Sequence, residues 1–134
     1  MLKDIPEYAV EDVAIAVVNE KNKEGEMEWN VYVINLKAVS LESVLVTSTG
    51  YGIIGEEEIK TSTLRHSLED IPANSFGKVE PIMESVFVIN NEYWLSFYLN
   101  NKMYDKKYVF LAESIREENF TLIPVINKRG VMIK

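Results

Sequence analysis

Hydrophobic and polar residues alternate along most of this chain, and the alternation predicts β-strands. In VAIAVV, residues 13–18, the β-branched residues fall mainly on one face, with Ala14 and Ala16 opposite. A helix is the alternative for this stretch, but its β-branched residues favour a strand. WNVYVINL, residues 29–36, and LESVLVTS, residues 41–48, alternate in the same way. We therefore expect successive strands that each bury one face.

Asn, Gly and Pro residues separate the alternating runs and indicate turns between them. IIGEEEIKTSTLRH, residues 53–66, reads as a hairpin turned at a glycine that leads into a threonine-rich strand. YWLSFYLNNKMYDKKYVF, residues 93–110, reads as a second hairpin around Asn100–Asn101, because Asn tolerates the left-handed backbone of tight turns. By the same reasoning we predict another turn at Asn90–Asn91.

These runs predict an all-β fold of about eight or nine short strands with at most one or two helical turns. The helical turns are expected after Ser67 and after Ser114, because each is followed three residues later by an acidic side chain. We expect an antiparallel two-sheet sandwich, residues 1–134 forming one domain. The strand cadence of residues 29–48, followed by DIPANSFGKVEPI, is typical of immunoglobulin-like domains. A small closed barrel is the alternative.

The composition of the chain limits the kinds of catalytic site, metal site and partner that it can have. The 134 residues are enough to bury a core without disulfides or metals, and the chain has no cysteine. Thiol nucleophiles, thiolate zinc sites and iron–sulfur clusters are therefore excluded. The formal net charge of −7 would repel nucleic acid, so we do not expect a nucleic-acid partner.

The first 20 residues contain no basic segment followed by a long apolar run, and residues 13–18 are too few to span a membrane. We therefore expect a cytoplasmic protein without a membrane partner. The absence of cysteine fits a reducing compartment.

The most reactive-looking stretch is TSTLRHSL, residues 61–68, which holds the single histidine, His66. On a strand, Thr63, Arg65 and Ser67 would share one face and His66 would lie on the other. Arg65 between two hydroxyl groups could hold a phosphate or carboxylate. We name Thr63, Arg65, His66 and Ser67 as candidate ligand-binding residues; the alternative is a polar strand that faces solvent.

No other stretch predicts a catalytic or metal site, and we predict no cofactor. The acidic clusters at residues 56–58 and 113–118 lack the spacing of a calcium loop, so we interpret them as solvated surfaces. Gly50, Gly52 and Gly55 do not match a phosphate-binding or dinucleotide-binding loop, and we interpret them as turn or bulge glycines.

The hairpin at residues 93–110 mixes aromatic and basic side chains, which can form either a core strand pair or a stacking platform for nucleic acid. Period-two reading places one set of rings in the core. We predict that the other set forms an interaction surface suited to a protein partner: Trp94, Tyr98, Tyr104, Lys106 and Tyr108. Only Lys106 lies among these rings, while Lys107 shares its face with Asp105.

Four stretches together carry a family resemblance: YGIIGEEEIKTSTLRHSL, IPANSFGKVEPIMESVF, NNEYWLSFYLNNKMYDKKYVF and INKRGVMI. The chain resembles a family of short, uncharacterised bacterial proteins, some of which are labelled phenylalanyl-tRNA synthetase alpha subunit. The label would imply a sheet flanked by helices, with arginines that grip ATP. Here the only arginines are Arg65, Arg116 and Arg129, in three different contexts, and no long helix is predicted. We expect no aminoacylation by this chain.

The function favoured by these observations is a non-enzymatic β-sandwich that acts through protein–protein contact or self-association, with a homodimer expected. Exposed rings and open sheet edges are the features available for pairing. An RNA- or tRNA-associated accessory protein, with Tyr98, Tyr104, Tyr108, Lys106 and Lys107 as a stacking surface, is one alternative. A binder of small anions that uses Arg65 and His66 is the other.

Overall fold

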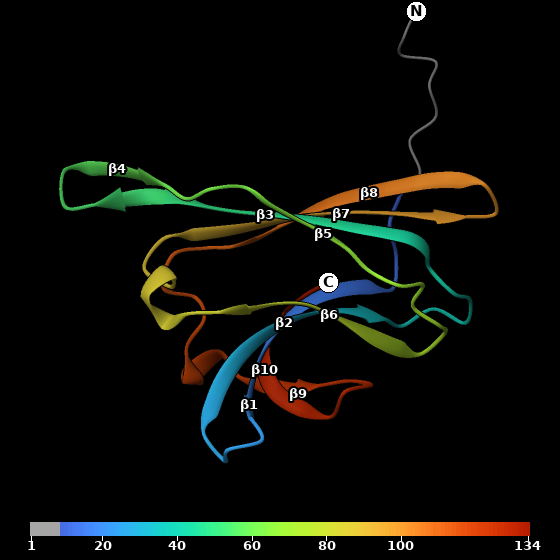
Figure 1. Ribbon diagram of the computed structural model, residues 1–134, viewed down its shortest axis with the longest axis horizontal. Helices are drawn as coiled ribbons and strands as arrows, with labels where there is room; N and C mark the ends of the chain where they lie inside the picture. The colour runs from blue at the N-terminus through green and yellow to red at the C-terminus, as the bar shows by residue number, and fades with distance from the viewer. Residues whose placement is uncertain (1–8) are drawn as a thin grey trace, which may run out of the picture.

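The computed structural model describes residues 9–134, which form two β-sheets (Figure 1). Residues 1–8, which begin the N-terminal segment in which no leader is expected, lie outside the described residues. The strands are β1 (Val13–Lys21), β2 (Met27–Asn35), β3 (Glu42–Ile54), β4 (Glu57–Lys60), β5 (Leu64–Ser67), β6 (Ser75–Ile82), β7 (Asn90–Leu99), β8 (Lys102–Phe110), β9 (Thr121–Ile123) and β10 (Lys128–Ile133). Within residues 9–134 there are also two short 3₁₀ helices, η2 (Glu84–Val86) and η3 (Glu117–Asn119).

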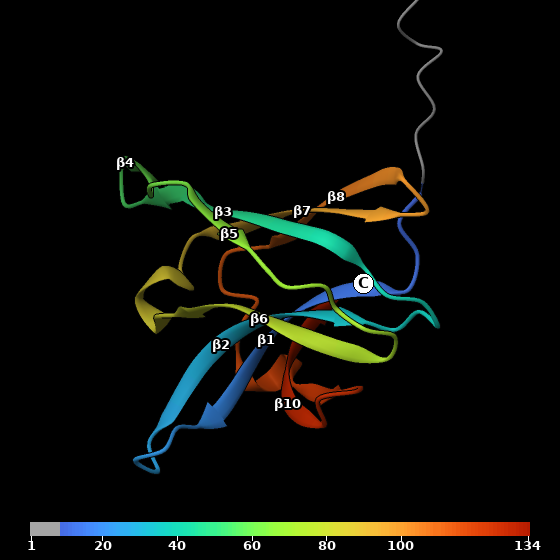
Figure 2. The same cartoon turned by 45° about the vertical axis from the view of Figure 1, so that its right-hand side comes forward.

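The predicted antiparallel sandwich is confirmed. The first sheet has the strand order β6-β2-β1-β10-β9, and the second has the order β4-β3-β7-β8 with β5 also paired to β3. The two sheets lie as separate layers in both views, the second above the first (Figures 1 and 2). Every strand pair is antiparallel.

The immunoglobulin-like character of the sandwich lies in its pairing order. Strand β2 pairs with β6 in the first sheet. In the second sheet, β3 pairs with β7 and β7 pairs with β8. This is the order of the B–E and C–F–G strands of an immunoglobulin domain. The described residues hold more strands than the eight or nine expected, because β4 and β5 are two short pieces along one edge of β3 and β9 has three residues.

The main core lies between the sheets and follows the predicted alternation. Val13, Ile15 and Val17 of β1 are at most 1% exposed and pack with β-branched residues of β2 and β3. The second sheet contributes larger side chains from β7 and β8, among them Tyr93, Phe97, Tyr108 and Phe110. Small β-branched residues in one layer thus face aromatic rings in the other, which fills the space between the sheets.

A second apolar cluster covers the opposite face of the first sheet. Ala14, Ala16 and Val18 are fully buried there, together with Tyr32 and Ile34 of β2. Ile123 of β9 and the turn residues Val125 and Ile126 pack against them. The small alanines leave room for this turn, so β1 is buried on both faces.

Asn35, at the end of β2, is a fully buried polar residue with every polar atom of its side chain engaged. Its amide nitrogen lies 2.9–3.1 Å from the backbone carbonyl oxygens of Val39, Ile71 and Pro72, and its amide oxygen accepts a hydrogen bond from the Lys37 N–H. The Asn35 side chain therefore links the β2–β3 connection to the segment that precedes β6.

One of the two predicted Asn–Asn turns is confirmed. Asn100 and Asn101 have φ angles of 49° and 63° and join β7 to β8. The turn predicted at Asn90–Asn91 is wrong, because both residues belong to β7. The buried Asn91 side chain instead donates to the carbonyl oxygens of Val86 and Ile89 and holds the preceding loop.

The helical turns also differ from the expectation. The segment after Ser67 is extended, since Ile71 pairs with Leu41 and the Asp70 carboxylate accepts from the Ser43 N–H. A short helix does follow Ser114, but Ser114 does not cap it: its hydroxyl donates to the Leu111 carbonyl oxygen. The helix η2 was not predicted.

Candidate functional site

The most prominent candidate site is the outward side of the second sheet, which we call the outer face. It carries four large apolar side chains that are 40–50% exposed: Leu45, Trp94, Tyr98 and Met103. Tyr98 is directly opposite Met103 in the β7–β8 register, and Leu45 is opposite Ser96. The four side chains are therefore neighbours on one surface.

Charged and polar residues lie in rows across the outer face, because residues opposite each other in an antiparallel sheet point the same way. One row contains Arg65, Thr47, Trp94 and Lys107, in that order from β5 to β8. The next row contains Ser67, Leu45, Ser96 and Asp105. A cationic row thus lies beside a row that ends in a carboxylate.

The structure brings together residues that the sequence assigned to two different sites. Arg65 and Ser67, predicted as ligand-binding residues, share the outer face with Trp94 and Tyr98, predicted as an interaction surface. The Thr63 hydroxyl lies 2.8 Å from that of Thr49, in the neighbouring row of the same face.

The other three residues of the predicted interaction surface belong to the inner face. Tyr108 is 1% exposed, and Tyr104 stacks on Phe97 with the ring centroids 5.4 Å apart. Lys106 lies over the Tyr108 ring, with its ammonium nitrogen 5.1 Å from the ring centroid. Placing these three residues on one surface with Trp94 and Tyr98 was therefore wrong, and the aromatic stacking platform is divided between two sides of the sheet.

The hairpin register explains this correction. A two-residue turn at Asn100–Asn101 pairs Leu99 with Lys102, which sets Tyr104 opposite Phe97 and Tyr108 opposite Tyr93. Because Phe97 and Tyr93 point into the core, their partners do too. The turn was recognised in the sequence, so counting outward from it would have identified the correct face. The alternation around Val44 and Val46 would likewise have placed Leu45 on the outer face.

His66 is separated from Arg65 and points between the sheets. Its Nε2 lies 2.6 Å from Oε1 of Glu80, a residue of β6 in the other sheet. The same carboxylate accepts hydrogen bonds from the Ser48 hydroxyl at 2.8 Å and from the Tyr93 hydroxyl at 3.2 Å. Glu80 was not among the predicted site residues, because its partners come from three other strands that only the fold brings to it.

Glu80 and its partners Ser48, His66 and Tyr93, which we call the Glu80 cluster, connect the two sheets. The Glu80 side chain is 12% exposed and receives three donors, which compensates for the burial of its charge. Ser48 donates to the carboxylate, so the serine hydroxyl is not paired with the imidazole as a nucleophile would be. Burial raises the pKa of the Tyr93 phenol, and the charge and hydrogen bond of Glu80 raise it further.

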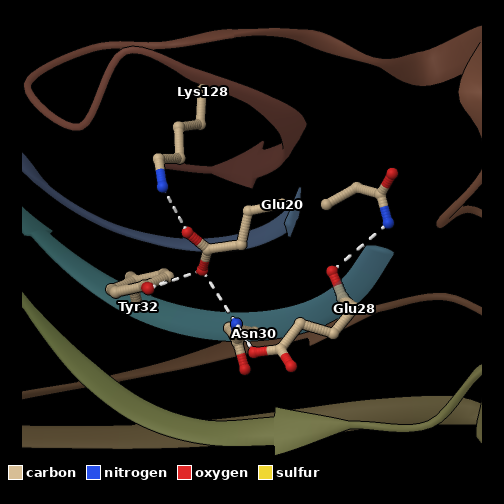
Figure 3. A network of polar contacts seen from close by, with 6 residues as sticks. Glu20, Glu28, Asn30, Tyr32 and Lys128 are labelled. Atoms are coloured by element: carbon tan, nitrogen blue, oxygen red, sulfur yellow. Dashed lines mark hydrogen bonds and ion pairs between the residues drawn. The ribbon is translucent and has the colours of Figure 1, made fainter. Parts of the chain in front are cut away.

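A second polar network centres on Glu20, near the end of β1 (Figure 3). Its Oε1 lies 2.6 Å from Lys128 Nζ, and its Oε2 accepts from the Tyr32 hydroxyl at 2.6 Å and from the Asn30 amide at 2.8 Å. The Asn30 amide also donates to Glu28, the residue directly opposite Glu20. The network therefore holds two facing carboxylates with one amide and one ammonium group.

Protonation in this network follows from its contacts. Burial alone would raise the pKa of Glu20, but the hydrogen bonds from Lys128, Tyr32 and Asn30 and the Lys128 charge together lower it. Burial raises the pKa of Tyr32, and its hydrogen bond to the Glu20 carboxylate and the charge of that group raise it further. Glu20 is thus held as the anion and Tyr32 as the neutral phenol.

Within residues 9–134, no three metal-ligating side chains gather into a group that could hold a metal ion. The same residues include no helix long and apolar enough to cross a membrane. Comparison with models of known protein families and with curated proteins gave no match.

Proposed function

We propose that this chain is a non-enzymatic β-sandwich domain that acts through protein–protein contact, and that its outer face pairs with a second copy of the chain. The observation that carries the proposal is the contiguous apolar group on that face. Trp94 and Tyr98 are residue types that dominate binding energy in protein interfaces. Apolar side chains that adjoin one another over a sheet face are typical of an interaction surface, whereas scattered ones are ordinary.

The charge rows favour a second copy as the partner. A twofold axis that runs across the strands, between the two rows, would place Lys107 opposite Asp105 of the second copy. The same axis would set Trp94 above Ser96 and place Arg65 over Ser67, so neither cation would meet a cation. Such a self-complementary face meets the requirement of a twofold-symmetric interface.

Two of the sheet edges, formed by β8 and by β6, are poorer candidates for self-pairing than the outer face. The edge strand β8 carries Lys102, Lys106 and Lys107, and lysines on an edge strand oppose pairing with another chain. Strand β6, at the edge of the first sheet, contains Pro81, which has no N–H to donate. These features direct self-association to the face.

The proposal is tested by the mass of the protein in solution. Multi-angle light scattering over a concentration series should approach twice the chain mass of 15.4 kDa. Trp94→Ala should weaken the dimer by more than about tenfold in dissociation constant, as expected for a central aromatic residue. A monomer at every concentration contradicts the proposal.

A charge exchange tests the geometry of the dimer. Lys107→Asp would set two carboxylates against each other and weaken the dimer, and adding Asp105→Lys should restore it. The control is Lys23→Asp, which makes the same change in net charge in the exposed β1–β2 turn. A dimer that responds equally to Lys107→Asp and Lys23→Asp would place the contact elsewhere.

A further inference from the structure

A groove lies beside the end of the β1–β2 hairpin, separate from the outer face. It has a volume of about 730 Å³, within the range of small-molecule sites. Its apolar lining comes from Met27, Trp29, Phe87, Ile115 and Phe120, which belong to β2 and to the segments around η2 and η3. We call it the Trp29 groove.

The aromatic wall of the Trp29 groove is ordered by direct contacts. The Trp29 ring meets Phe87 edge-on at a centroid distance of 5.0 Å and Phe120 at 5.6 Å. The Trp29 indole N–H also donates to Glu84 Oε1 at 2.9 Å. Three rings from distant parts of the chain therefore form a fixed apolar surface, which suits a ring-bearing ligand.

The charges around the Trp29 groove are biased toward cations, although the chain as a whole carries −7. Four basic residues line it, Lys21, Arg116, Lys128 and Arg129, with three acidic ones, Glu20, Glu84 and Glu117. Lys128 neutralises Glu20, whereas the neutral Trp29 indole that donates to Glu84 leaves the charge of that carboxylate in place. The lining therefore has a formal excess of one positive charge.

Three of the four lining cations, Lys21, Arg116 and Arg129, are not neutralised by Glu20, and the two arginines among them can present a planar guanidinium to a carboxylate. Among the described residues, neither the Arg116 nor the Arg129 guanidinium has a carboxylate within 4.0 Å. Arg129 lies over the Phe120 ring, with its guanidinium carbon 5.9 Å from the ring centroid. A guanidinium placed beside an aromatic wall can bind a carboxylate whose apolar body rests on the rings.

We propose that the Trp29 groove binds a small aromatic carboxylate, with the ring system against Trp29, Phe87 and Phe120 and the anionic group at Arg116 and Arg129. Lys128 contributes less, because Glu20 neutralises it. The Glu117 side chain, which also lines the groove, disfavours ligands that carry more than one negative charge at that end. The proposal does not depend on dimer formation, since the groove and the outer face share no residue.

Tryptophan fluorescence can test the proposal directly, because the chain has only two tryptophans, Trp29 and Trp94. Trp94→Phe leaves Trp29 as the only reporter. We would titrate this variant with anilinonaphthalene sulfonate, an aromatic monoanion that stands in for the carboxylate ligand. Saturable quenching of Trp29 is expected. The matched variant Trp29→Phe should report no saturable quenching of Trp94.

The role of the arginines is tested with the same probe. Arg116→Gln combined with Arg129→Gln should raise the dissociation constant by about tenfold, while Lys60→Gln combined with Lys134→Gln, which removes two charges at exposed residues outside the groove, should leave it unaltered. The uncharged analogue phenylnaphthylamine should bind more weakly to the parent chain, and its dissociation constant should not change when the two arginines are replaced.

Three results would overturn the proposal: no saturable quenching of Trp29, quenching confined to Trp94, or affinity for the sulfonate that the double arginine variant retains. Circular dichroism of each variant establishes that a lost signal reflects the groove and not unfolding. If Trp29→Phe proves unfolded, the arginine series in the Trp94→Phe chain still decides the outcome.

Discussion

The Tyr108 hydroxyl donates a hydrogen bond to the Val13 carbonyl oxygen at 2.7 Å, joining β8 of one sheet to β1 of the other. Both residues are 1% exposed, so the bond crosses the sandwich without contact with water. Together with the Glu80 cluster, it gives the space between the sheets a polar connection within an apolar core.

Removing this hydroxyl should destabilise the fold. We expect Tyr108→Phe to lower the free energy of unfolding by about 1–2 kcal/mol, because the ring still packs while the carbonyl loses its side-chain donor. Tyr98→Phe on the outer face is the control and should change it by less than about 0.5 kcal/mol. Urea unfolding followed by fluorescence measures both, and equal effects would show that the inter-sheet bond is unimportant.

Alkaline pH should unfold the protein through its buried phenols. The pKa values of Tyr32, Tyr93 and Tyr108 are all raised, mainly by burial. Their contribution to stability is therefore complete below the unfolded-state pKa of about 10 and is lost as pH rises toward the folded-state values. Phenolate absorbance of these three should appear only with the loss of circular dichroism.

Tyr93→Phe provides the check on this alkaline transition, because it should remove one phenol from the group that ionises on unfolding. Ionisation of all three phenols in the folded protein near pH 10 would contradict the assignment.

Acid should weaken the Glu20 network. Because the folded-state pKa of Glu20 lies below its usual value of 4.5, the unfolded chain takes up the proton first. The stabilisation is therefore present above that value and is lost as pH falls through the folded-state pKa. Lys128→Gln should reduce stability at neutral pH by about 1 kcal/mol and flatten this acid dependence.

The matched control for Lys128→Gln is Lys134→Gln, since Lys134 pairs with Asp12 at 3.5 Å and both side chains are more than half exposed. Thermal unfolding across a pH series compares the two variants. If both variants lose stability in acid to the same extent, the Glu20 network is not the cause of the acid dependence.

Gly130 permits a close approach between β10 and β1. A Cβ atom at this position would lie 2.1 Å from the Val17 carbonyl oxygen, a backbone atom that cannot move aside. We expect Gly130→Ala to cost at least about 3 kcal/mol, because the strands must separate. Thr121→Ala, at the exposed residue paired with Gly130 on β9, is the control. Chemical denaturation that finds both variants equally stable would contradict the close packing.

Sequence patterns predicted the fold wherever one side of a strand is core and the other is solvent. Period-two alternation identified β1, β2, β3 and the β7–β8 hairpin, since each needs a row of apolar side chains on its inner face. The alternation could not reveal that β1 is buried on both faces. Small residues such as Ala14 and Ala16 occur both on faces covered by other parts of the chain and on faces exposed to water, so the sequence does not distinguish the two cases.

The candidate site was predicted only in part, because it depends on register and on contacts between sheets. Arg65 and Trp94 come to share a face through their common partner Thr47, a relationship that strand order and register together determine. The His66–Glu80 contact depends on how the two sheets pack, and no local signal encodes that distance. Asn90–Asn91 carried the same turn signal as Asn100–Asn101, but the Asn91 side chain is used inside β7 to hold the preceding loop.

The pairing of β1 with β10 has a consequence for how the chain is made. Val18 pairs with Gly130, so the first described strand finds one of its two neighbours only after every other strand has been synthesised. Contacts between residues so distant in sequence slow folding, because a long loop must close before they form. During translation the apolar edge of β1 stays unpaired, and the nascent chain is then most exposed to aggregation and to chaperone binding.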